Sequence, residues 1–185
     1  MFVLSCVIGL VLQGRTLVLV AGMPGAGKST LLAGLPADQD LVVLDSDDYR
    51  SGWGRLLPGV PYGWYRPLVH LCHRAGVVRA AFSEVTTVLV HLPATAESTR
   101  SKVARLAAWS GRLAHLLWLD VDPAEALRGQ LERGRVVPEA SFRRHAERAA
   151  TSTVSLRTGP PAGFDGVTVL DRRTARAGLH LQATP

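Results

Sequence analysis

The sequence contains little cysteine and no hydrophobic run long enough to span a membrane. Only two of its 185 residues are cysteines, Cys6 and Cys72, which is too few for a disulfide framework and unlike the spacing of a metal site. The apolar run at residues 2–12 is too short to cross a bilayer, and no basic segment precedes it as in a signal peptide. We therefore expect a cytoplasmic protein without membrane association.

Lysines and aromatic residues are also scarce. Lys28 and Lys102 are the only lysines, so the formal net charge of +6 comes from arginine. A basic surface can attract nucleic acid, but an arginine bias can equally reflect coding composition. With aromatic residues at 6%, no basic, aromatic-rich platform for single strands is visible. Charge alone therefore does not decide whether the partner is a polyanion.

A glycine-rich segment follows a short apolar run at residues 17–30, which read LVLVAGMPGAGKST. The run suits a buried parallel strand, and the residues after it fit the pattern GxxxxGK[ST]. Glycines let backbone N–H groups turn toward an anion, the lysine adds charge for the β- and γ-phosphates, and the serine hydroxyl suits Mg²⁺. The segment predicts an ATP site with Mg²⁺, formed by Gly22, Met23, Pro24, Gly25, Ala26, Gly27, Lys28, Ser29 and Thr30.

Strands alternate with helical patterns along the rest of the chain, which is typical of a parallel sheet covered on both faces. The expected strands after the first are 41–44, 85–90, 113–119 and 167–170, and the expected helices are 28–34, 65–82, 96–110, 122–133 and 138–150. Residues 51–63 are rich in glycine and proline and predict a loop. We expect an α/β fold of three αβα layers around a five-stranded parallel sheet.

Domain boundaries follow from this pattern. Residues 16–171 form the expected P-loop NTPase or kinase domain, with a small lid at about 133–145. Residues 1–15 are interpreted as an apolar extension, either an extra strand or a segment outside the native fold. Residues 172–185 are interpreted as a C-terminal tail.

Two carboxylates follow the second expected strand. Asp45 and Asp47 are two residues apart, so they share a face if the strand geometry continues. A kinase needs one carboxylate to hold Mg²⁺ and another to accept the proton of the attacking hydroxyl. We assign the first task to Asp45, together with Ser29, and the second to Asp47. The alternative is an acidic turn that caps a helix.

Two further residues are candidates for contact with the acceptor. Arg50 lies three residues after Asp47, where it could hold an anionic group, although a solvated surface arginine is nearly as good an explanation. His91 ends the third expected strand, on the same edge of the sheet, where it could contact substrate or serve a structural role.

The segment 132–145 predicts a lid. It places Arg133 and Arg135 on either side of a glycine at the end of a helix, before a new helix. Arginines in such a position can neutralise charge on a transferred phosphoryl group. The alternative is a helix end whose basic residues complement the dipole.

We also considered Asp120 as an Mg²⁺-linked residue, Asp122 as a helix cap, and Arg172 and Arg173 as residues that stack on the nucleotide base.

Taken together, GMPGAGKST, LDSDDYR and ERGRVVP make residues 16–171 resemble the P-loop kinases that include zeta toxins and the 5′-hydroxyl kinase domain of phage-type polynucleotide kinase. The resemblance implies that Asp47 is the catalytic aspartate, Arg50 contacts the acceptor phosphate and Arg133 is the lid arginine. The Asp-Ser-Asp spelling also resembles shikimate- and gluconate-type kinases, in which the first aspartate helps to hold Mg²⁺. His91 departs from the acidic residue that related kinases often carry there.

We therefore expect an ATP- and Mg²⁺-dependent phosphotransferase that acts on a hydroxyl of a small molecule or of a nucleic-acid end. Lys28, Asp47 and Arg133 are the expected catalytic residues. The alternative is an NTP-binding ATPase or switch that binds a protein partner and phosphorylates no acceptor. The sequence gives no indication of the oligomeric state.

Overall fold

The computed structural model describes residues 8–35, 40–92, 94–134 and 136–184. The strands in these ranges are β1 (Ile8–Gln13), β2 (Thr16–Gly22), β3 (Leu41–Asp45), β4 (Thr87–His91), β5 (Leu113–Asp120), β6 (Gly166–Asp171) and β7 (Leu179–Thr184). The helices are α1 (Lys28–Ala33), α2 (Ser46–Leu56), α3 (Tyr62–Ala81), α4 (Glu97–Trp109), α5 (Pro123–Glu132), α6 (Glu139–Leu156) and α7 (Arg172–Ala177).

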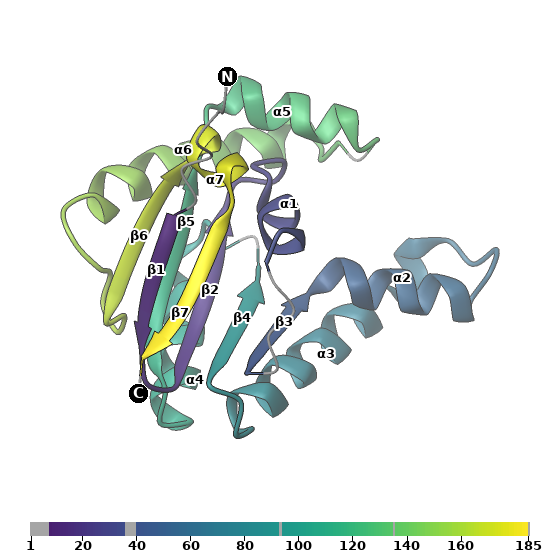
Figure 1. Cartoon of the computed structure of the whole chain (residues 1–185). Coiled ribbons are helices and arrows are strands. Elements are labelled where there is room, and N and C mark those ends of the chain that lie inside the picture. Colours follow the sequence, from purple (N-terminus) through teal and green to yellow (C-terminus); the bar gives the residue numbers. More distant parts are fainter. Residues whose placement is uncertain (1–7, 36–39, 93, 135, 185) are drawn as a thin grey trace, which may run out of the picture.

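Five of the strands form a parallel sheet in the order β3-β4-β2-β5-β6 (Figure 1). The central strand β2 is buried at every residue because it has a strand on each side and cover on both faces. Such a strand is expected to be apolar along its whole length rather than alternating, as the run Leu17–Ala21 is. The α/β class and the five-stranded parallel sheet are confirmed.

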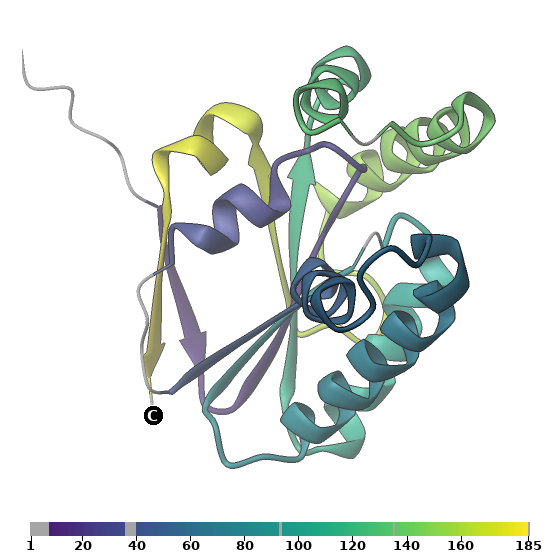
Figure 2. The same cartoon turned by 90° about the vertical axis from the view of Figure 1, so that its right-hand side faces the viewer.

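Helices cover both faces of this sheet, which gives the expected three layers (Figure 2). One face carries α3, α4 and α6, and the other carries α1 and α7. The second face also carries a small parallel sheet, in which β1 pairs with β7 from Ile8 opposite Leu179 to Gln13 opposite Thr184. Leu10, Leu12 and Leu179 are buried there as part of the core.

Where the C-terminal segment was interpreted as a tail, the structure has α7 and β7. Asp171 caps α7 by accepting a hydrogen bond from the N–H of Thr174, and Gly178 then connects the helix to β7. β7 pairs with β1, which lies in the N-terminal segment for which an extra strand was one of the two interpretations. This sheet could not be predicted from the sequence because both strands are short and they lie at opposite ends of the chain.

The segment 51–63 was expected to be a loop, but most of it is helical. α2 continues to Leu56 and α3 begins at Tyr62, so only residues 57–61 connect them. The Asp45 carboxylate starts α2 by accepting a hydrogen bond from the Asp47 N–H at 2.9 Å. This cap and the packing of α2 against α3 outweigh the cost of about 1 kcal/mol for each helical glycine.

Parallel strands end at one edge of the sheet, and this arrangement positions the candidate site. Gly22, Asp45, His91, Asp120 and Asp171 are the last residues of β2 to β6 respectively. Ligands of open α/β sheets bind at this edge. Within the described ranges, none of the helices combines the length and apolarity needed to span a membrane.

Candidate active site

The segment between β2 and α1 is a tight loop whose glycines are required by the surrounding backbone. Gly25 has φ +87°, and a Cβ atom built on it would lie 2.0 Å from the carbonyl oxygen of Ala126 in α5. Gly27 has φ +96° and precedes the first residue of α1. Only glycine adopts these conformations without strain, and only glycine lets α5 approach so closely. The loop is therefore held against α5 in one shape.

Lys28 is buried in the centre of this loop. Its Nζ donates hydrogen bonds to the carbonyl oxygens of Gly22, at 3.0 Å, and Met23, at 2.7 Å. Burial, with a further contribution from the positive charge of Arg133, lowers the pKa of Lys28 from 10.5 to about 7, although Asp45 acts in the opposite direction. The amine is therefore held by the loop that precedes it and gains charge readily when an anion approaches.

Ser29 follows Lys28 and faces the same space. Its hydroxyl oxygen is buried and faces the Asp45 carboxylate, whose pKa it helps to lower. A buried hydroxyl beside an ionised carboxylate fits a ligand position for Mg²⁺, which commonly takes one or two protein ligands and completes its shell with phosphate oxygens and water. No three His, Cys, Asp or Glu side chains come together in the described ranges to form a metal site made of protein alone.

Asp45 lies at the end of β3 and contacts the end of β4. Its Oδ1 is 2.8 Å from Nδ1 of His91, whose strand is paired with β3 at this position. Burial alone would raise the pKa of Asp45, but the contact with His91 and the N–H of Asp47 together lower it to about 2. Asp45 is therefore a fixed negative charge, and His91 is the residue that holds it.

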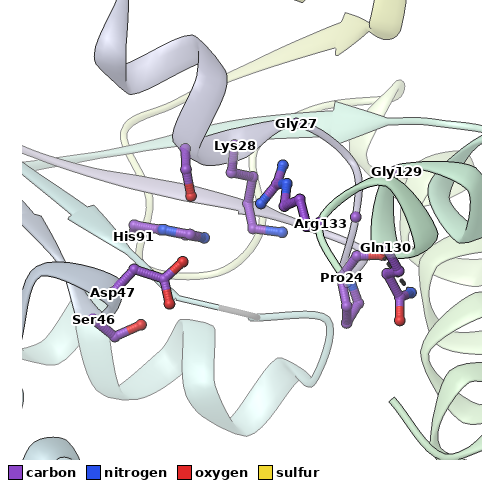
Figure 3. Close-up of a pocket in the computed structure, with 11 residues that line it drawn as sticks. Pro24, Gly27, Lys28, Ser46, Asp47, His91, Gly129, Gln130 and Arg133 are labelled. Carbon is purple, nitrogen blue, oxygen red and sulfur yellow. Dashed lines mark hydrogen bonds between the residues drawn. The ribbon is translucent and has the colours of Figure 1, made fainter. Parts of the chain in front are cut away.

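Asp47 occupies the first turn of α2 rather than a strand. The expectation that Asp45 and Asp47 share a strand face is therefore wrong, because the helix begins at Ser46. Asp47 nevertheless lines a cavity of about 180 Å³ together with Lys28, Ser29, His91 and Arg133. Figure 3 shows the Asp47 carboxylate directed toward this cavity from α2 and the Arg133 side chain entering it from the end of α5.

Two residues of α5 that sequence reasoning missed connect this helix to the loop. A Cβ atom on Gly129 would lie 2.5 Å from the carbonyl oxygen of Gly25, so only glycine fits there. The buried amide of Gln130 donates to the carbonyl of Pro24 at 3.0 Å and accepts from the N–H of Val137 at 2.9 Å. A glycine in the middle of an amphipathic helix was the available signal for Gly129. No local signal marked Gln130.

A second cavity of about 230 Å³ lies on the other side of the same loop. It shares Gly25, Gly27, Gly129 and Arg133 with the first cavity. Ala26 and Thr30, both expected at the ATP site, line it as well, and α7 contributes Arg172, Ala175 and Arg176. The loop between β2 and α1 therefore lies between two cavities, one lined by Asp47 and the other lined by residues of α7.

Several expected residues lie away from both cavities. Arg50 stacks on the ring of Tyr62, with its guanidinium carbon 4.1 Å from the ring centroid. Asp120 contacts Arg157 at 2.9 Å and Thr153 at 3.1 Å, so it serves the packing of α6. Asp122 caps α5, as expected. Arg135 lies outside the described residues.

The predicted lid region contains a turn and the start of a helix. Gly134 has φ +62° directly after Arg133, and α6 begins at Glu139. Farther along α6, the His145 Nδ1 lies 2.8 Å from the hydroxyl of Thr95, in the segment after β4. Burial lowers the pKa of His145, and the positive charges of Arg148 and Lys28 add to this effect. α6 therefore reaches the edge of the sheet where the phosphate loop lies.

A family model named AAA_33, described as an AAA domain, matches residues 17–152. This range extends from β2 through the phosphate loop to α6 and covers well over half of the chain. The chain belongs to the AAA domain family. No curated protein matches the sequence of this AAA domain significantly.

Several solved structures share the expected α/β fold of this AAA domain. A chain of the PezAT chromosomal toxin–antitoxin system of Streptococcus pneumoniae matches with a TM-score of 0.61 at 17% identity, over 85% of this chain and 67% of that one. The Pnkp1/Rnl/Hen1 RNA repair complex matches at 0.61 and 16%, over 78% and 47%. The AvrRxo1-ORF1:AvrRxo1-ORF2 complex matches at 0.58 and 13%, over 85% and 54%. The AAA domain therefore spans about half the length of the latter two.

The pKa of Lys28 leads to a prediction about nucleotide binding. ATP should bind more weakly as the pH rises from 7 to 9, because the free protein loses the Lys28 proton near pH 7, whereas a bound triphosphate favours the charged amine. One linked proton raises the Kd by up to about tenfold per pH unit. Titration calorimetry in Mg²⁺-free buffers would measure this dependence. The Lys28→Arg variant, which stays protonated, should lack it; an equally steep dependence in that variant would contradict the assignment.

Proposed function

We propose that this AAA domain is an ATP- and Mg²⁺-dependent phosphotransferase with a hydroxyl as acceptor. The observation that carries the proposal is the position of Asp47, which faces one cavity together with Lys28, Ser29 and Arg133. A protein that only binds nucleotide does not need a carboxylate opposite the phosphate loop, whereas one that hydrolyses ATP uses a group there to activate water. A kinase needs a carboxylate within reach of the attacking hydroxyl.

Each residue of the cavity has a task in this reaction. Lys28 and the N–H groups of the loop would hold the β- and γ-phosphates of ATP. Ser29, with Asp45 behind it, would hold Mg²⁺, which neutralises charge on the phosphates. Asp45 is suited to this because its low pKa keeps it ionised at any physiological pH.

Asp47 would accept the proton of the acceptor hydroxyl while the hydroxyl oxygen bonds to the γ-phosphorus. The bond from that phosphorus to the bridging oxygen breaks in the same step, and ADP leaves. Arg133 would neutralise the charge on the phosphoryl group during transfer. Its place at the end of α5, next to Gly134, suits a residue that adjusts as the lid closes.

The second cavity would take the nucleoside part of ATP. It begins at the same loop and ends at α7, where Arg172 and Arg176 line it. Arginine side chains can stack on a purine ring, and the Arg172 guanidinium is fixed by a hydrogen bond of 2.6 Å to the carbonyl of Glu125. The site would therefore place the triphosphate across the loop, with its γ-phosphate on the side of Asp47.

The acceptor is a small molecule or a nucleic-acid end. Structures similar in fold include both a toxin–antitoxin system and an RNA repair complex. The net charge of +6 suits a polyanion. In contrast, Arg50 stacks on Tyr62 rather than entering the cavity, so the residue expected to hold an acceptor phosphate is already engaged.

A panel of acceptors tests the proposal. The protein is incubated with Mg²⁺ and ATP labelled in the γ-phosphate, together with oligonucleotides with 5′-hydroxyl ends, nucleosides, sugars, nucleotide sugars or antibiotics. We expect label to pass to one class, and phosphorylation of an oligonucleotide should weaken steeply as salt is added. Hydrolysis of ATP at one rate with and without every acceptor would instead favour the switch or ATPase.

A further inference from the structure

Helix α3 carries a continuous apolar stripe on the face that points away from the protein. The stripe consists of Trp64 (83% exposed), Leu68 (37%), Leu71 (64%), Val78 (46%) and Phe82 (57%), with Ala75, also exposed, between them. Most of these residues, from Leu68 to Phe82, also gave the helical spacing from which a helix at 65–82 was expected. The helix is confirmed, but its buried face is a different one, formed by Val69, His73, Val77, Ala80 and Ala81.

The spacing along this stripe is that of a coiled-coil seam. Successive members are separated by four, three, four, three and four residues, so they occupy the a and d positions of a heptad repeat from Trp64 to Phe82. At 1.5 Å per residue the stripe is about 27 Å long. Because α3 already packs on the protein through its other face, this second apolar face does not contribute to the core, and an exposed apolar patch of this kind indicates an interaction site. The stripe is therefore shaped for another helix.

The residues that flank this seam determine which helix can pack on it. With Leu68 and Leu71 at positions a and d, Arg74 occupies position g and Arg79 occupies position e, and both side chains are exposed. Helix α3 contains no acidic residue. Charges at positions e and g determine which helices can pair with a seam. Because both flanks of this seam carry an arginine, they favour a partner helix with acidic residues at its e and g positions.

A second copy of the chain is a poor occupant for the same reason. In a parallel pair of α3 helices, Arg74 at position g of one copy would face Arg79 at position e of the other. In an antiparallel pair with the two stripes aligned, Arg74 would face Arg74 of the other copy, whereas Arg79 would face Tyr65. Like charges are brought together in both arrangements, and like-charge juxtaposition costs binding energy. The seam therefore disfavours self-association and favours a different chain.

We propose that the outer face of α3 is a docking site for an amphipathic helix of a partner protein, with apolar residues at its a and d positions and acidic residues at e and g. The site lies over β3 and β4, at the edge of the sheet that β3 forms (Figure 1). It is separate from both cavities, so it is independent of the proposed phosphotransferase activity.

A pair of synthetic peptides tests this proposal on the full chain. Both have three heptads with leucine at a and d; one has glutamate at every e and g position and the other has lysine. Acetylated, amidated and dye-labelled peptides are titrated with protein, and fluorescence anisotropy is measured. We expect the glutamate peptide to bind, with a preference of about tenfold or more over the lysine peptide. The glutamates also repel each other, which limits self-association of the peptide.

Variants locate the binding on α3. Leu71→Asp should abolish it, whereas Val154→Asp, at a residue that is 72% exposed on α6, should leave it unchanged. Exchange of both flanking charges, in Arg74→Glu with Arg79→Glu, should reverse the preference toward the lysine peptide. All of these positions are exposed, and circular dichroism and the Tm check that each variant folds.

Three outcomes would overturn the proposal. The first is no binding of the glutamate peptide, or binding that Leu71→Asp does not affect. The second is a concentration-dependent dimer of the protein alone that Leu71→Asp abolishes in sedimentation, which would make a second copy the occupant. The third is Leu71-dependent binding to phosphatidylserine vesicles without discrimination between the peptides, which would indicate a membrane surface.

Discussion

Replacement of Asp47 by asparagine is expected to lower the rate of acceptor phosphorylation by about 10²- to 10⁴-fold, the usual contribution of a positioned general base. Affinity for ATP should remain largely unchanged, because the nucleotide would be held by the loop and Lys28 on the other side of the cavity. The amide keeps the size of the carboxylate but cannot accept the proton. Single-turnover transfer and titration calorimetry measure the two effects separately.

Asp48→Asn is the matched control for this variant. Asp48 is the next residue in the same first turn of α2, and it is exposed and absent from the cavity lining. The two variants therefore change the net charge and the helix N-terminus in the same way. We expect Asp48→Asn to phosphorylate the acceptor normally. Equal losses in both variants would show that α2 matters through its charge or stability and that Asp47 is not the base.

Replacement of Gly129 by alanine should damage the phosphate loop through a direct clash from α5. The new Cβ would lie 2.5 Å from the carbonyl oxygen of Gly25, closer than real contacts allow, so either α5 or the loop must move. Overpacking of this kind costs about 1–3 kcal/mol of stability. Displacement of catalytic groups by about 1 Å can slow a reaction by about 10²-fold. We expect a lower Tm and a loss of ATP affinity together.

Gly52→Ala provides the control for helix propensity. Gly52 lies inside α2, and a Cβ atom there would have no heavy atom within 4 Å. Alanine should therefore stabilise the protein at this position by about 0.5–1 kcal/mol, the ordinary gain in a helix. If Gly129→Ala also raised the Tm and retained ATP affinity, the close approach of α5 to the loop would not be a constraint on function.

The parts of the site that are formed by residues close together in the sequence could be predicted. The phosphate loop follows from residues 17–30 alone, since strand, turn and helix are adjacent in the chain. The parallel sheet follows from the alternation of apolar runs with helical patterns. Asp47 lines the cavity from a helix rather than from a strand, since it lies only two residues past the end of β3 and three past the end of the expected strand.

Features that depend on contacts between distant segments could not be predicted. Gln130 acts through a hydrogen bond to Pro24, more than 100 residues away. β1 and β7 pair across nearly the whole chain. The apolar residues of α3 recur regularly in the sequence and were therefore expected to be buried. The sequence does not show that the helix packs through a different face, which leaves this stripe exposed. The glycines of α2 were interpreted as loop signals because the packing of α2 against α3, which helps to outweigh their cost, is not visible in the sequence.

The side chain of Gln130 joins two segments that would otherwise be independent. One end of its amide is bonded to the backbone of Pro24, and the other to the backbone of Val137, beyond the lid arginine. A shift of the loop on arrival of a ligand must therefore either carry residue 137 with it or break one of these bonds. The position of the loop at Pro24 and the position of the segment at Val137 are therefore coupled, and the coupling runs through one uncharged side chain.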